Sequence, residues 1–197
     1  MSGVSPWELA LRGRLRQLDP ALADYFSTIP AGHVGRGSGT FDVVGTPRRW
    51  LWPIFAILGR AAIAFPVWEH DVPFEVVNVP GDGAVRATLA FGFRRGERVM
   101  RHEIRMTPHG LVDSLGTRGR LEAALLPDTV DGRLELHSTG VRLRLGAARI
   151  PIPFAPRVTL IERRDGDRQR VEFSMTAPVI GRIYEYAGTF SYRIEAA

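Results

Sequence analysis

The chain contains no cysteine at all, which excludes several kinds of chemistry at once. Disulfide bonds, a thiolate nucleophile and a cysteine-ligated metal centre all require this residue. Lysine is absent as well, so that all 26 positively charged side chains are arginines. Arginine suits paired contacts with phosphates and carboxylates, but a complete lack of lysine is more typical of a GC-rich coding sequence.

A concentrated patch of one charge is also missing. The net charge is only +5, because 21 acidic residues are interspersed with the arginines. Several arginines alternate with apolar residues, as outward-facing positions of strands do: Arg142, Arg144, Arg163, Arg168 and Arg170. Since a nucleic-acid-binding surface requires clustered positive charge, we expect a solvated surface and no nucleic-acid partner.

The sequence has no uninterrupted apolar run long enough for a membrane span. Its most apolar stretch, residues 50–68, is broken by Pro53, Gly59, Arg60 and Pro66. A central arginine alone costs roughly 2.5–3.5 kcal/mol on a membrane-insertion scale. Residues 1–16 lack the apolar core and the cleavage site of a secretory signal. We therefore expect a soluble, cytoplasmic protein.

Three tryptophans flank or lie within the same stretch: Trp50, Trp52 and Trp68. Tryptophan is enriched where membrane meets water. These side chains predict, at most, a weak contact with a membrane surface.

The N-terminal part, residues 1–35, has the apolar spacing of helices. Apolar residues fall at helical intervals at Trp7, Leu11, Leu15 and Leu18. Asp19 followed by Pro20 is typical of an N-cap with proline at the first helical position. A second helix is therefore predicted from Pro20 to about Ser27.

A third helix is predicted over Pro53–Ala64. Its apolar stripe is formed by Ile54, Ile57, Leu58, Ala61 and Phe65. We expect this stripe to be buried against strands, with Arg60 on the polar side.

From Asp71 onward the apolar period changes to two, which is typical of strands. Turn residues separate the predicted strands, which are Val72–Val79, Ala84–Phe93, Arg98–Met106, Leu111–Leu115, Arg120–Leu125, Arg133–His137, Val141–Leu145, Arg157–Arg163, Arg168–Met175 and Arg182–Ile194. An earlier strand is predicted at Thr40–Val44. The glycines before it, Gly35, Gly37 and Gly39, predict a flexible turn.

Many short strands with tight turns and no helices between them predict one antiparallel meander. The expected fold class is therefore mainly β: a curved sheet or a closed or half-closed barrel, with N-terminal helices and one apolar helix packed over it. We expect a single domain over residues 1–197. It would consist of the helical segment 1–35 and a barrel-like core, 40–197, that includes the helix 53–64.

Side-chain alternation along the strands sorts residues by face. It places Met100, His102, Ile104 and Met106 together on an apolar, inward face. Leu111 shares its face with Asp113, and Val158 shares its face with Glu162. A barrel with this interior would have the composition of a small-molecule pocket. The candidate ligand-binding residues are His102, Met100, Met106, Glu162, Tyr184, Tyr186 and Tyr192.

Each of these residues also has a purely structural interpretation. A lone histidine on an apolar face is commonly a hydrogen-bonded core residue, and a tyrosine near a strand end often reaches solvent or a backbone partner. Glu162 could lie at a strand terminus. The sequence leaves these alternatives open.

No metal or cofactor site is predicted. His102-Glu103 lacks the second histidine that a zinc protease motif needs, because Met106 occupies that position. Adjacent residues of an extended chain point in opposite directions, so Glu69-His70-Asp71 is interpreted as a turn.

Several short stretches, taken in order, resemble a known family. They are Asp71-Val72-Pro73, Gly110-Leu111-Val112, Arg149-Ile150-Pro151-Ile152-Pro153 followed by Ala155-Pro156-Arg157, Asp165-Gly166 and Tyr186-Ala187-Gly188. The run from about Leu18 to Ile194 thereby resembles a bacterial family known only as domain of unknown function family 4166. The resemblance implies no activity. Similar domains sometimes follow a module resembling saccharopine dehydrogenase, which implies a dehydrogenase-like partner.

Three functions remain open from the sequence. The first is a barrel that binds an apolar or lipid-like small molecule. The second is an enzyme acting on a small apolar substrate in the same pocket, with His102, Glu162 or Tyr186 as acid–base groups. The third is a structural or interaction domain with a filled core. An interior cavity would distinguish the first two from the third.

Overall fold

The computed structural model describes residues 4–197, most of which lie in strands. Within this range the helical elements are α1 (Pro6–Leu11), η1 (Arg14–Gln17), α2 (Pro20–Phe26), η2 (Arg49–Leu51) and α3 (Trp52–Arg60). The strands are β1 (His33–Gly45), β2 (Trp68–Gly81), β3 (Ala84–Phe93), β4 (Gly96–Thr107), β5 (Gly110–Leu115), β6 (Leu121–Val130), β7 (Arg133–Leu145), β8 (Ala148–Pro151), β9 (Arg157–Asp165), β10 (Arg168–Ala177) and β11 (Gly181–Ala196).

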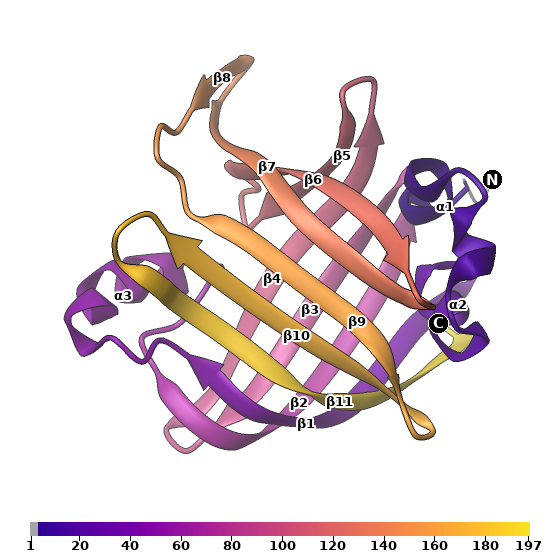
Figure 1. Cartoon of the computed structure of the whole chain (residues 1–197), viewed down its shortest axis with the longest axis horizontal. Helices are drawn as coiled ribbons and strands as arrows, with labels where there is room; N and C mark the ends of the chain where they lie inside the picture. Colours follow the sequence, from indigo (N-terminus) through magenta and orange to yellow (C-terminus); the bar gives the residue numbers. More distant parts are fainter. Residues whose placement is uncertain (1–3) are drawn as a thin grey trace.

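Ten of the described strands form a closed barrel, in which each neighbouring pair is antiparallel (Figure 1). Their order is β6-β5-β4-β3-β2-β1-β11-β10-β9-β7, and the ring closes because β6 pairs with β7. The predicted antiparallel barrel is confirmed. Its first and last strands, β1 and β11, lie side by side along almost their whole length.

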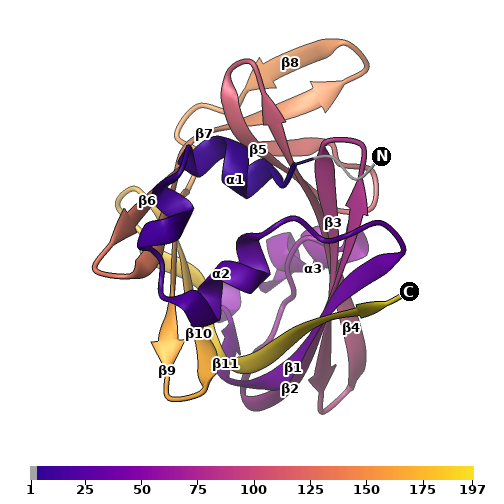
Figure 2. The same cartoon turned by 90° about the vertical axis from the view of Figure 1, so that its right-hand side faces the viewer.

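The β7–β8 hairpin departs from the predicted strands. The two short strands expected at residues 133–137 and 141–145 form one long strand, β7. Its second half parts from β9 and pairs with β8, while its other edge stays paired with β6. Figure 2 shows this hairpin projecting beyond the barrel wall. β8 was not predicted, because all four of its residues are exposed and so show no apolar alternation.

The glycines of β1 correct another expectation. Gly35, Gly37 and Gly39 do not form a flexible turn but lie within the strand. A Cβ at Gly35 would lie 1.5 Å from the hydroxyl oxygen of Tyr192, and one at Gly39 would lie 2.0 Å from the carbonyl oxygen of Thr189. Glycine is therefore required at Gly39, where the backbone of β11 lies against β1, whereas at Gly35 the Tyr192 side chain could move aside. Glycines of this kind let strands bend sharply, as barrel closure demands.

Helices cover both ends of the barrel (Figure 2). At one end, the Ser5 side chain caps α1 and the Asp19 side chain caps α2, which begins with Pro20 as predicted. Leu11, Leu22 and several other helical residues are buried against strands β4 to β7. The N-terminal helices thereby close this end with a small apolar core of their own.

At the opposite end, α3 differs from the prediction in its length and in its buried face. It spans Trp52–Arg60 and not Pro53–Ala64. Ile54 and Ile57, expected to be buried, are 54% and 65% exposed, whereas Phe55 is buried with 2% exposed. Apolar residues occur all around this helix, so the spacing alone did not determine which side faces the barrel. Arg60 is exposed, as expected.

The segment after α3 adds further residues to the core that Leu51 and Phe55 enter. The backbone turns at Ala62, which has a positive φ of 58°, and the nitrogen of Arg101 on β4 donates a hydrogen bond to the Ala62 carbonyl. Ala64 and Phe65 then enter the larger apolar core. None of the described helices has the length and apolarity needed to cross a membrane.

We expect Gly39→Ala to destabilise the barrel strongly. The new Cβ would collide with the backbone of β11, so strands must separate; overpacking of this kind costs about 1–3 kcal/mol or more. Urea unfolding followed by circular dichroism measures the loss. Gly140→Ala is the matched control, because a Cβ there meets nothing within 4 Å. Equal stability of the two variants would contradict this role for Gly39.

Candidate ligand-binding site

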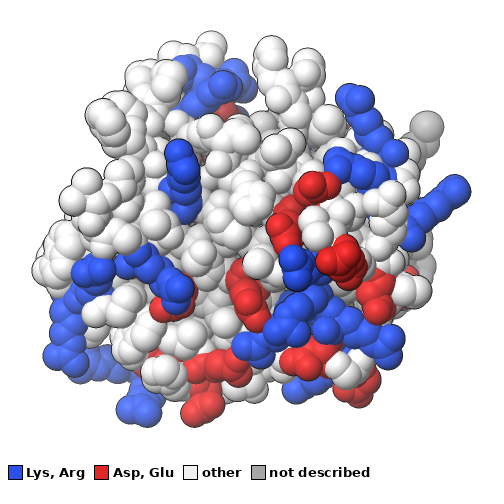
Figure 3. Space-filling view, in the orientation of Figure 1, with Lys and Arg blue, Asp and Glu red and all other residues white. Residues whose placement is uncertain are grey.

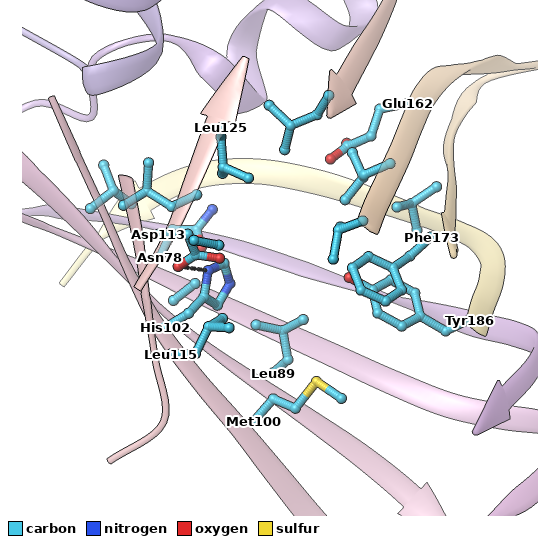
Figure 4. Close-up of a pocket in the computed structure, with 18 of the residues that line it drawn as sticks. Asn78, Leu89, Met100, His102, Asp113, Leu115, Leu125, Glu162, Phe173 and Tyr186 are labelled. Atoms are coloured by element: carbon cyan, nitrogen blue, oxygen red, sulfur yellow. Dashed lines mark hydrogen bonds and ion pairs between the residues drawn. The ribbon is translucent and has the colours of Figure 1, made fainter. Parts of the chain in front are cut away.

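The barrel encloses a cavity of about 160 Å³. Every one of the ten barrel strands contributes to its wall, and residues from the N-terminal helices and from the segment after α3 close its ends. The wall is mostly aliphatic and aromatic (Figure 4). The cavity lies between the two apolar cores, so the interior is not completely filled.

His102 and Asp113 form a hydrogen-bonded pair on one wall. They come from the adjacent strands β4 and β5, and 3.1 Å separates His102 Nδ1 from Asp113 Oδ1 (Figure 4). Burial works against a charged imidazole, but the charge of Asp113 and the hydrogen bond outweigh it, so the pKa of His102 is raised. In the described part of the chain, His102 Nε2 makes no hydrogen bond and is free for a ligand.

Asn78 belongs to the same wall and was missed by the sequence analysis. Cross-strand pairing places Asn78, Ala87 and His102 in one row across β2, β3 and β4. The amide nitrogen of Asn78 donates to the hydroxyl of Tyr192 at 3.2 Å. Asn78 is only 4% exposed, and its Oδ1 has no hydrogen-bond partner among the described residues. Its position in the inward phase of β2, after Phe74 and Val76, was the available signal.

Glu162 faces this wall from across the cavity (Figure 4). It lies inside β9 and is 6% exposed, so the alternative of a strand terminus is wrong. Gln169 on β10 donates a hydrogen bond to its carboxyl group. Burial raises the pKa of Glu162 to about 7, although the Gln169 hydrogen bond and the charge of His102 act in the opposite direction. A carboxyl group that changes charge near neutral pH therefore faces an apolar cavity.

The other predicted residues divide into two groups. Met100, Tyr184 and Tyr186 line the cavity together with His102 and Glu162. Met106 does not; it packs against the apolar core beneath the N-terminal helices. Tyr192 also lies outside the cavity wall, with its ring 4.7 Å from that of Tyr25.

The two tyrosines in the wall are held in fixed positions. Tyr184 accepts a hydrogen bond from the backbone nitrogen of Phe65 at 3.4 Å. Tyr186 stacks on Phe173, with ring centroids 4.5 Å apart. Burial raises the pKa of both hydroxyls well above their usual value, so both remain neutral near physiological pH.

Within residues 4–197, no three histidine, aspartate or glutamate side chains are close enough together to hold a metal ion. The site is instead a mostly apolar chamber with a few polar groups in its wall. Among them, Asn78 and the His102–Asp113 pair lie on one wall, and Glu162 lies on the other.

Fold and site together define a closed ten-stranded antiparallel barrel with a small, mostly apolar internal cavity. The chain belongs to the family described as Domain of unknown function (DUF4166), which matches residues 18–190. The resemblance based on short motifs is thereby confirmed. No curated protein matches the chain.

We expect the stability of the domain to fall as pH rises from about 5 to about 8. The pKa of Glu162 is raised from 4.5 to about 7 in the folded state, so folding favours the protonated form. The stability that protonated Glu162 contributes is fully present below the unfolded pKa and is lost as pH rises through the folded pKa. The loss is roughly 3 kcal/mol, at about 1.36 kcal/mol per pKa unit. The raised pKa of His102 acts in the same direction.

Glu162→Gln should remove most of this loss, because the amide stays neutral throughout. Urea unfolding at both pH values measures the effect. Glu97→Gln, an exposed position on β4, is the control and should keep the wild-type dependence. An unchanged pH dependence in Glu162→Gln would contradict the raised pKa.

Proposed function

We propose that this domain binds a compact, mostly apolar molecule that carries one or two hydrogen-bonding groups. The observation that carries the proposal is the partly polar cavity inside a closed barrel, about 160 Å³ in volume. A cavity costs stability, because its lining atoms lose packing contacts. A polar group in that lining without a partner costs more. Ligand binding would compensate for both.

The volume limits the size of the ligand. An engineered cavity of about 150 Å³ takes up benzene, whereas pockets for drug-sized molecules measure roughly 300–1,000 Å³. The barrel would therefore accept a single ring or a short chain. A long acyl chain would fit only if the wall moved.

The polar groups favour a ligand with a hydroxyl group. Asn78 Oδ1 is a buried acceptor without a donor, and leaving it so costs about 1–3 kcal/mol. A hydroxyl could donate to this oxygen once the Asn78 side chain turns toward the cavity, while His102, two strands away in the same cross-strand row, contacts the hydroxyl oxygen. Phenols and small cyclic alcohols have this combination of an apolar body and one polar group.

We expect phenol and cyclohexanol to raise the melting temperature of the domain more than benzene does, because only the alcohols satisfy Asn78. Asn78→Leu should lower the affinity for phenol roughly five- to tenfold, the value of one neutral hydrogen bond, and leave benzene unaffected. Thermal shift and titration calorimetry measure both effects.

Two variants act as controls for that experiment. Tyr192→Phe removes the other hydrogen bond of the Asn78 side chain, outside the cavity wall, and should retain the preference for phenol. Ala87→Leu fills the space between Asn78 and His102 and should abolish binding of all three compounds. If none of the compounds shifts the melting temperature of the wild type, the proposal is wrong.

A second function, acid–base catalysis, is favoured by one specific observation. Glu162 has a pKa of about 7 and faces a His102–Asp113 pair across an apolar space. General acids and bases work best with a pKa near the operating pH, and burial is the usual means of reaching it. The cavity could therefore move a proton on a small apolar substrate.

Benzisoxazole is a suitable probe for this second function. A base removes the proton from C3, the N–O bond breaks, and 2-cyanophenolate forms without any other reactant. We expect the rate to rise with pH through about 7, as Glu162 loses its proton, and to fall about 10²-fold or more in Glu162→Gln. Absorbance of the phenolate measures it. A rate equal to that in buffer would exclude Glu162 as a base.

A further inference from the structure

Exposed apolar side chains gather at the α3 end of the barrel. Thirteen large apolar residues are exposed among residues 4–197, and nine of them lie at this end or on the β7–β8 hairpin that projects beside it. They come from α3 and its approach, the β7–β8 hairpin, the β8–β9 loop, the β10–β11 turn and the start of β2: Trp50, Ile54, Ile57, Trp68, Leu145, Ile150, Ile152, Phe154 and Val179. Figure 1 shows α3 and the β10–β11 turn at the left side of the molecule and the β7–β8 hairpin projecting at the top.

The outer face of α3 is one continuous part of this surface. Ile54 and Ile57 are three residues apart and therefore share one side of α3. Trp50 lies just before the helix, in η2. The exposed fractions of Trp50, Ile54 and Ile57 are 60%, 54% and 65%. The inner side of the helix already packs into the barrel through Leu51 and Phe55. A helix that is apolar all around is normally covered on all sides, and here one side is uncovered.

Two loop tips present apolar side chains in an unfavourable backbone conformation. Phe154, between β8 and β9, is 88% exposed with a φ of 54°, and Val179, between β10 and β11, is fully exposed with a φ of 68°. Left-handed backbone is unusual for a phenylalanine and strongly disfavoured for a β-branched valine. Neither residue is needed for packing, since both face solvent. Strain of this kind is commonly retained where a residue serves a function.

The same end of the barrel carries positive charge. Arg48, Arg49, Arg60 and Arg157 make no ion pair within residues 4–197. Arg48 donates a hydrogen bond to the carbonyl of Arg182, which joins the approach to α3 to the β10–β11 turn. Figure 3 shows arginine side chains gathered at its left edge, over α3, whereas positive and negative side chains alternate on the right.

From these features we infer that the α3 end of the barrel docks onto the surface of an anionic lipid bilayer. The apolar side chains project from several separate segments around a barrel end. Inserted singly among lipid chains, they need no complementary surface. Unpaired arginines between them match the negative charge of the headgroups, and their side chains can extend toward the interface.

This docking differs from the contact that the sequence predicted. Trp50 and Trp68 are exposed at the α3 end, but Trp52 is half-buried, and its indole nitrogen has no contact with solvent. Ile54, Ile57, Phe154 and Val179 replace it as the inserting residues. The inference does not rest on any ligand of the cavity. It would, however, place Ile63 and Ala64, which line the cavity just after α3, close to the membrane.

Vesicle flotation with the full chain tests the inference. We compare vesicles of phosphatidylcholine alone with vesicles that also contain phosphatidylglycerol. Binding to the anionic vesicles should be at least tenfold stronger and should weaken as salt is raised, because headgroup attraction is screened. Absence of binding to anionic vesicles, or equal binding to both compositions, would overturn it.

Two substitutions distinguish insertion from simple charge attraction. Ile57→Asp and Val179→Asn, made together, should reduce binding to anionic vesicles about tenfold or more. Asparagine tolerates left-handed backbone better than valine. The Val179→Asn variant alone should therefore be at least as stable as the wild type and yet bind more weakly to anionic vesicles. Val79→Asp with Leu126→Asp changes two exposed apolar residues away from this end and should leave binding unchanged.

The alternative is that the surface joins two copies of the chain. Size-exclusion chromatography without lipid examines this. A monomeric wild type supports docking on the bilayer. A wild-type dimer that the Ile57→Asp and Val179→Asn changes convert to a monomer would show that the surface is a self-interface.

Discussion

The pairing of β6 with β7 is the contact on which the rest of the structure depends, because it converts an open sheet into a closed barrel. Closure fixes which side chains face inward on every strand. An eight-stranded barrel has an interior that side chains can just fill, and this barrel has ten strands. The helices and Phe65 fill part of the additional space from the two ends, and the cavity is what remains.

Closure also determines the electrostatics of the interior. An inward-facing carboxyl group in a closed barrel is removed from water on all sides, and without a strong partner its charged form is disfavoured. Asp113 has His102 within 3.1 Å, whereas Glu162 has only the amide of Gln169, and its pKa rises to about 7. The interior therefore combines an acid that is paired with a histidine and an acid whose pKa lies near 7. That difference gives the cavity its chemical character.

The two ends of the barrel differ in how completely their apolar residues are buried. The N-terminal helices bury their apolar residues in a second core, and an ion pair between Arg14 and Asp128 joins them to β6. At the other end, α3 buries Leu51 and Phe55 but leaves Ile54 and Ile57 exposed. The end covered by the N-terminal helices thus buries its apolar residues within the fold, while the α3 end exposes apolar side chains and unpaired arginines. This asymmetry gives the barrel a direction relative to any surface that it meets.

The sequence by itself determined most of the strands, an antiparallel sheet that is curved or closed, and the inward phase of His102, Met100 and Glu162, because alternation is a local property that each strand carries in its own residues. Burial of Glu162, the partner of His102 and the buried side of α3 were decided only by tertiary structure, since they depend on which distant segments pack together. The glycines of β1 show the same limit: read locally they predict a turn, and only their pairing with β11 and β2 places them in a strand. The cavity could not be predicted from the sequence either, because its volume is the space that side chains from all ten strands leave unfilled inside the closed barrel.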